Sequence, residues 1–155
     1  MDFLGPLTSI GKRLFGDRAR RQAADRRVAD RALHLRRQLA ASFEDWPAGP
    51  RTLEELVRWA IKLTHGFVAM DAALAALVEP SADASRKARR AVTKARDEYY
   101  AVANLVNPVT RDANIVIKRP WEGAEASAMA APLRRAWAHM RPCLAALDSA
   151  SAAND

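Results

Sequence analysis

The most restrictive feature of this sequence is an apolar stripe that begins abruptly at Val28, inside a longer stretch of helical composition. Residues 17–27 contain no large apolar side chain, and their arginines point in every direction around a helix. We therefore predict one helix over 17–46, with residues 17–27 as a solvated basic extension of a packed part. Apolar residues at helical spacing form the stripe of the packed part: Val28, Ala32, Leu35, Leu39, Phe43 and Trp46.

A second helix is predicted from Leu53 to Val78. It follows the break "WPAGP", and Thr52 with Glu55 forms a capping box at its start. Its apolar face is the broadest in the chain, which is typical of a central helix with several neighbours. The face is predicted to comprise Leu53, Leu56, Val57, Ala60, Phe67, Val68, Leu74, Ala75 and Val78.

Two more helices complete the predicted bundle. The stretch "EPSADAS" predicts a turn, with Ser81 or Asp83 as the cap of a helix that ends at "NP", residues 107–108. A long irregular connection is predicted over 108–130. The last helix carries one apolar stripe: Met129, Leu133, Ala136, Met140, Leu144 and Leu147.

Composition agrees with an all-α fold, because half of the residues are apolar, alanine is abundant and only six glycines are present. We predict an antiparallel four-helix bundle over 17–150, with a projecting basic N-terminal helix. Residues 1–16 are predicted to form a separate amphipathic N-terminal segment, which Gly5, Pro6 and Gly11 weaken as an independent helix.

The N-terminus combines apolar and basic residues and is the first candidate site. Between Lys12 and Arg37 there are ten basic and three acidic residues, an excess of seven that equals the net charge of +7. An amphipathic segment followed by basic residues is typical of docking to an anionic membrane surface. The residues predicted to dock are Phe3, Leu4, Leu7, Ile10, Leu14 and Phe15 by insertion, and Lys12, Arg13, Arg18, Arg20 and Arg21 by attraction to phosphate.

Three other interpretations of the N-terminus stay open. The apolar segment could pack on the chain's own bundle, or it could bind an apolar groove of a partner protein. The arginine-rich helix could also bind nucleic acid through its phosphates, without sequence specificity, since Gln22 is the only candidate base reader between Asp17 and Ala32.

Asp71 is the most informative single residue outside the N-terminus. A helical projection places it on the apolar face of the 53–78 helix, where a buried carboxylate needs a partner or a proton. No second acidic residue or histidine shares its face, so a hydrogen bond to Tyr99 or a bond to a buried arginine is expected rather than a metal site.

Two pairs of residues resemble the Arg-x(4–6)-His element of HEPN ribonucleases, which are also small helical bundles. Six residues separate Arg58 from His65, and four separate Arg134 from His139. The resemblance implies RNA cleavage by an arginine and a histidine, generally in a dimer. The chain departs from the family just after each arginine, where Trp59 and Arg135 replace the polar residue typical there.

The sequence lacks other signatures of enzymes and cofactor sites. It has no glycine-rich phosphate loop, no Gly-x-Ser-x-Gly elbow and no His-Glu-x-x-His pair, and Cys143 is its only cysteine. No uncharged apolar run approaches the roughly 18–20 residues of a membrane span; the nearest, 66–78, contains Asp71. We expect a cytoplasmic or membrane-associated binding or assembly protein, without enzymatic activity, cofactor or metal, and able to form homo-oligomers.

Overall fold

The chain is all-α in a computed structural model that describes residues 5–44, 46, 48–111 and 123–154, with the side chains of 14–153 in these ranges. The described residues form four α-helices and no strand: α1 (Gly5–Phe43), α2 (Leu53–Ser81), α3 (Arg86–Thr110) and α5 (Gly123–Ser151). A short 3-10 helix, η1 (Ala152–Asn154), follows α5. The prediction of an all-α bundle is confirmed.

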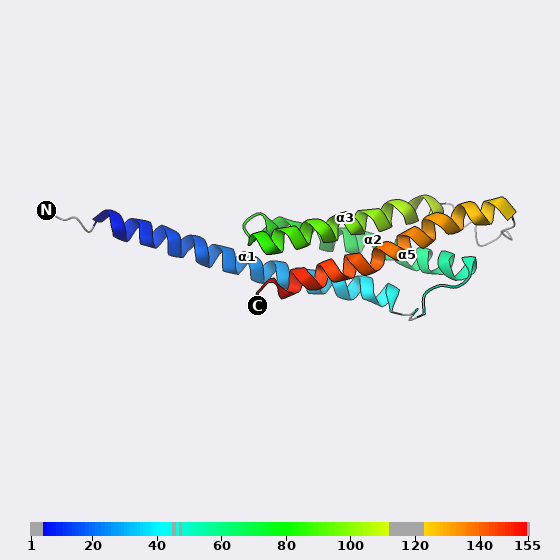
Figure 1. Cartoon of the computed structure of the whole chain (residues 1–155), viewed down its shortest axis with the longest axis horizontal. Helices are drawn as coiled ribbons and strands as arrows, with labels where there is room; N and C mark the ends of the chain where they lie inside the picture. Colours follow the sequence, from blue (N-terminus) through cyan, green and yellow to red (C-terminus); the bar gives the residue numbers. More distant parts are fainter. Residues whose placement is uncertain (1–4, 45, 47, 112–122, 155) are drawn as a thin grey trace.

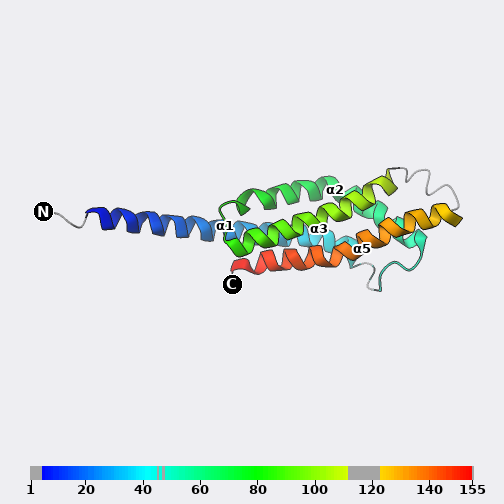
Figure 2. The ribbon, with the colours of Figure 1, turned by 45° about the horizontal axis from the view of Figure 1, so that its top comes forward.

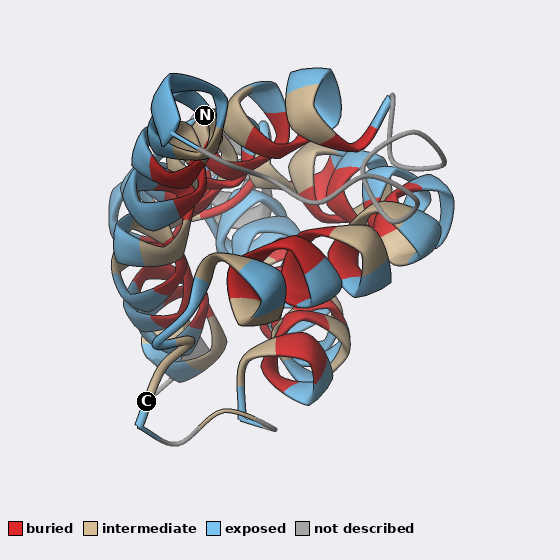
Figure 3. Ribbon diagram, turned by 90° about the vertical axis from the view of Figure 1, so that its right-hand side faces the viewer, coloured by how far each residue is buried: buried red, intermediate tan, exposed pale blue. Residues whose placement is uncertain are grey.

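The four helices lie side by side, as Figure 1 and Figure 2 show, and their buried side chains form one hydrophobic core. The C-terminal half of α1 packs against α2 and α5, and α3 packs against the same two helices from the other side. In the end-on view of Figure 3 the buried residues gather where the helices face one another. The N-terminal half of α1 projects beyond the ends of the other helices.

The predicted stripe of α1 lies in the core. Val28, Ala32, Leu35 and Leu39 are at most 1% exposed, and Phe43 and Trp46 pack against them partly buried. Contact with the bundle begins earlier than the sequence indicated, at Ala24, which is 5% exposed. The reason is Asp25, whose Oδ1 accepts the backbone N–H of Ser85 at 2.7 Å and fixes α1 to the turn before α3.

Residues 5–16 of the predicted amphipathic segment and the basic extension form one uninterrupted helix. α1 runs through Gly11 and Gly16, and its first turn contains Gly5 and Pro6. Proline is tolerated there because the first N–H groups of a helix have no intrahelical acceptor.

Helix α2 begins at the predicted capping box. The Thr52 hydroxyl accepts the N–H of Glu55 at 3.2 Å, and the Glu55 carboxylate accepts the N–H of Thr52 at 3.1 Å. The N–H groups of Arg51 and Thr52 lower the pKa of the Glu55 carboxyl, because they stabilise its charged form.

The buried side of α2 differs in part from the predicted face. Val68 and Ala75 are exposed, and Trp59, Leu63 and Leu77 are fully buried instead. The core positions alternate by four and three residues, which places Val68 and Ala75 beside this seam and not on it. The seam residues are Leu56, Ala60, Leu63, Phe67, Met70, Leu74 and Leu77.

The predicted boundaries between the last three helices need correction. α2 continues through Pro80 to Ser81, and the N-cap of α3 is Ser85, not Ser81 or Asp83, because the Ser85 hydroxyl accepts the N–H of Ala88. α3 continues through Pro108 to Thr110, and α5 already begins at Gly123. The predicted irregular connection over 108–130 is therefore too long at both ends, because 108–110 and 123–130 are helical; residues 112–122 lie outside the described residues.

Arg31 explains why α2 tolerates Pro80. Proline has no N–H, so the carbonyl of Ala76 lacks the N–H donor that it would normally have four residues later in the helix. Nη1 of Arg31 donates to that carbonyl and also lies 3.0 Å from Oε2 of Glu79. This contact satisfies the free carbonyl and joins α1 to α2.

We predict that Arg31→Met destabilises the wild-type chain by about 1 kcal/mol, because the half-buried Ala76 carbonyl loses its donor. In a Pro80→Ala background the same substitution should cost less, since the new N–H at position 80 can bond that carbonyl. Urea unfolding of the four chains measures the difference. Equal costs in both backgrounds would contradict this role of Arg31.

Candidate docking surface

The N-terminal part of α1, described here with its side chains from residue 14, carries apolar groups that face solvent. Residues 14–23 are all exposed, and Leu14 and Phe15 have 65% and 75% of their surface accessible. Arg18, Arg20 and Arg21 are exposed on the same stretch. We call residues 5–23 of α1 the arm.

The arm has an apolar side that continues the core-facing side of α1. Leu14 precedes Val28 by 14 residues, about 3.9 helical turns, so the two lie on nearly the same face. Val28 is fully buried, whereas Leu14 has 65% of its surface accessible. Leu14 and Phe15 are not part of the hydrophobic core.

Other predicted docking residues are only partly covered by the structure. The backbone of residues 7, 10, 12 and 13 is helical, but their side chains lie outside the described part, as do residues 3 and 4 altogether. The residues concerned are Phe3, Leu4, Leu7, Ile10, Lys12 and Arg13.

The base of the arm is fixed to the bundle by polar contacts as well as by the core. In addition to the Asp25 contact with Ser85, Nε of Arg36 lies 3.1 Å from Oδ1 of Asp148 in α5. These contacts hold the direction in which α1 leaves the bundle.

Asp71 has the expected partner but not the expected burial. Tyr99 donates its hydroxyl hydrogen to Oδ1 of Asp71 at 2.5 Å. Asp71 itself is exposed, because it follows Met70 one position beyond the α2 seam. Tyr99 is 1% exposed, and burial, with the bond to Asp71, raises the pKa of its phenol. The pair therefore joins α2 to α3 at the edge of the core.

The structure places each HEPN-like residue but does not bring the pairs together. Arg58 is exposed and bonds Glu54 at 2.6 Å, and His65 is exposed farther along α2. Nδ1 of His139 lies 2.6 Å from Oε2 of Glu98, a contact between α5 and α3. Within the described residues, no hydrogen bond or ion pair joins either arginine to its histidine.

The described residues give no sign of metal chemistry or of a reactive thiol. They contain no group of three or more histidine, cysteine or acidic side chains that could hold a metal ion. Cys143 is 1% exposed, and burial raises the pKa of its thiol to about 12, with a smaller contribution from Glu98. A thiol of that pKa stays protonated near neutrality and packs as a small apolar group.

Helix α2 is, by length and composition alone, apolar enough to cross a bilayer. The same helix supplies Trp59, Leu63 and Leu77 to the centre of the bundle, and core helices share this composition.

No protein-family profile, no curated protein and no solved structure matches this chain. The candidate surface is therefore interpreted from its own geometry.

We predict that the contact between Tyr99 and Asp71 makes stability depend on alkaline pH. The folded-state pKa of Tyr99 is raised above its ordinary value of 10.0, so this contribution is complete below pH 10 and is lost as the pH rises above it. Tyr99→Phe should cost about 1 kcal/mol near neutrality and should show a weaker loss of stability above pH 10.

Denaturant unfolding from neutral to alkaline pH measures both effects, and Tyr100→Phe is the matched control because Tyr100 is half exposed. Identical alkaline profiles for wild type and Tyr99→Phe would contradict the assignment.

Proposed function

We propose that this chain is a non-enzymatic docking protein, in which an antiparallel four-helix bundle carries a projecting basic helix that binds an anionic membrane surface. The observation that supports this most is the exposure of Leu14 and Phe15 on an arm whose N-terminal part projects beyond the other helices. Exposed large apolar side chains next to a basic stretch are typical of an interaction site.

The arm supplies two weak forces that add. Full burial of a leucine or phenylalanine side chain contributes roughly 1.5–3 kcal/mol. Each arginine near an anionic surface contributes about 1 kcal/mol. The arm would then bind an anionic membrane reversibly through two apolar side chains and three arginines: Leu14, Phe15, Arg18, Arg20 and Arg21. The apolar segment that precedes these residues would strengthen the binding.

The other interpretations differ in what they require. An apolar groove of a partner protein, or an oligomer of this chain, would cover the same side chains without lipid. Nucleic acid would need only the arginines. A HEPN-like ribonuclease would need His65 or His139, neither of which docking uses. The proposed location is cytoplasmic, with a membrane-associated fraction.

We predict that Leu14→Ser with Phe15→Ser reduces flotation with anionic phosphatidylserine vesicles at least tenfold, since the inserted side chains are lost. Val68→Ser is the matched control, because Val68 is 84% exposed but lies on the bundle and not on the arm. Sedimentation and flotation of each chain with anionic and with neutral vesicles measure the effect.

The control should float as the wild type does, and neutral vesicles should bind weakly. Undiminished flotation of the Leu14→Ser, Phe15→Ser chain, or no flotation of the wild type, would overturn the membrane proposal.

A further inference from the structure

A cavity at the base of the arm gathers arginines from two distant parts of the sequence. It has a volume of about 380 Å³ and lies between α1, the α2–α3 turn and the start of α3. Its charged lining consists of Arg20, Arg21, Arg86, Arg89, Asp17 and Asp83. We call it the arginine cavity. Four arginines and two aspartates line it, which leaves an excess of two positive charges.

The frame of the arginine cavity is fixed by buried contacts. Ala24 in α1 is 5% exposed, and Ala84, which precedes α3, is 4% exposed. Next to these two residues, Oδ1 of Asp25 accepts the backbone N–H of Ser85. The arginines of α1 and of α3 are thus attached to backbones that cannot separate without breaking the core. Such pre-organisation lowers the entropic cost of binding a ligand.

The four arginines have no partner within the described residues. Arg31, Arg36, Arg58 and Arg96 all bond acidic side chains. No hydrogen bond or ion pair of the described part of the chain includes the side chains of the arginine cavity. The first turn of α3 also contains no acidic residue, although Arg86 and Arg89 lie on neighbouring positions of one helix face and repel each other.

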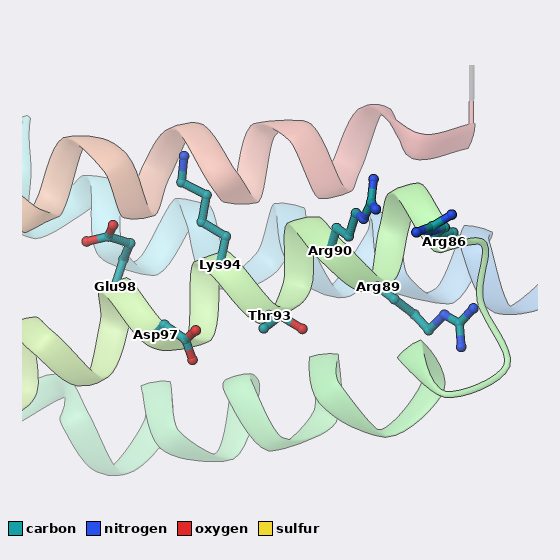
Figure 4. Close-up of a pocket in the computed structure, with 7 residues that line it drawn as sticks. All are labelled: Arg86, Arg89, Arg90, Thr93, Lys94, Asp97 and Glu98. Carbon is teal, nitrogen blue, oxygen red and sulfur yellow. The ribbon is translucent and has the colours of Figure 1, made fainter.

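Positive charge continues from the arginine cavity along the outer side of α3. A second, adjoining cavity shares Arg86 and Arg89 and adds Arg90 and Lys94. Figure 4 shows these side chains along the helix, with Asp97 and Glu98 only at the far end. The basic end of this surface is the end that lies next to the arm.

We propose that the arginine cavity binds the phosphate groups of a multiply phosphorylated lipid headgroup when the arm is on the membrane. This inference rests on the proposed function and adds the chemistry of the lipid. One phosphomonoester carries between about 1.5 and 2 negative charges at neutral pH, which matches the excess of two positive charges in the arginine cavity. Arg90 and Lys94 of the adjoining cavity supply positive charge for a second phosphate, whereas phosphatidylserine carries only one negative charge. Guanidinium groups bind phosphate oxygens in paired hydrogen bonds.

The size of the cavity agrees with this class of ligand. Sites for small molecules have volumes of about 300–1,000 Å³, and the arginine cavity falls within that range. Arg20 and Arg21 follow Leu14 by six and seven residues, a distance of about 10 Å along α1. An arm lying in the membrane surface therefore brings the cavity to the level of the headgroups.

The test compares full-length chains on two kinds of vesicle with equal total charge, one containing phosphatidylinositol bisphosphate and one containing only phosphatidylserine as the anionic lipid. The wild type should bind the phosphatidylinositol bisphosphate vesicles about tenfold more tightly. Arg86→Gln with Arg89→Gln, and separately Arg20→Gln with Arg21→Gln, should remove that preference.

The matched control is Arg134→Gln with Arg135→Gln, which removes the same charge from exposed positions of α5 outside the cavity. This control should keep the preference. Circular dichroism on each chain verifies that it is folded. Two results would overturn the proposal. One is that the chain with Arg86→Gln and Arg89→Gln still prefers phosphatidylinositol bisphosphate vesicles, and the other is that the control loses this preference equally.

The two proposals fail separately. If Leu14→Ser with Phe15→Ser floats like the wild type, the arm is not the membrane anchor. If the chain with Arg86→Gln and Arg89→Gln keeps its preference for phosphatidylinositol bisphosphate vesicles, the arm can still dock but the cavity does not select phosphate. Binding of soluble inositol trisphosphate as tight as that of the vesicles would overturn the lipid as ligand. Equal binding of a single-stranded oligonucleotide, lost in the same variants, would identify nucleic acid instead.

Discussion

Burial of one face of α1 against α2 and α5 is the constraint on which the bundle and the arm both depend. From Ala24 onward this face supplies Val28, Leu35 and Leu39 to the core. Before Ala24 the same helix continues, but the helices that would cover it have ended. The continuity of α1 transmits the stability of the packed part to a segment that makes no core contact of its own, because propagating a helix costs less than nucleating one.

Helical spacing was sufficient to predict the all-α fold and most of the core, since each stripe has one dominant face. It was less accurate at the edges of a face. The projection placed Asp71 and Val68 with the buried residues, whereas the four-and-three seam through Met70 and Leu74 leaves both outside. When the apolar face of a helix is broad and rich in alanine, the sequence alone does not show which of its residues lie at the centre. The neighbouring helices determine which residues are buried.

Helix ends were the least predictable part, and the reason is tertiary. Pro80 looked like a terminator, but a donor from Arg31 in another helix satisfies the carbonyl that proline leaves free. Ser85 caps α3 while its own N–H bonds Asp25. Neither contact has a local signal in the sequence. Arg31 and the Ala76 carbonyl that it bonds are far apart in the sequence, and so are Asp25 and Ser85.

The candidate site divides in the same way. The apolar and basic character of the arm is visible in the sequence, since it concerns neighbouring residues of one helix. The arginine cavity is not, because Arg20 and Arg86 meet only through the contact of α1 with the α2–α3 turn. The basic residues Arg86, Arg89, Arg90 and Lys94 are close together in the sequence, but only the fold places them beside the arm.

Hydrogen–deuterium exchange along α1 tests the central claim most directly, since it reports where the helix is covered. The account predicts that amides of 14–23 exchange much faster than those of 28–39 in the free protein, and that anionic vesicles slow the exchange of 14–23 but not that of 28–39. Slow exchange of 14–23 without vesicles, equal to that of 28–39, would show that the arm is covered by the protein itself and would contradict the account.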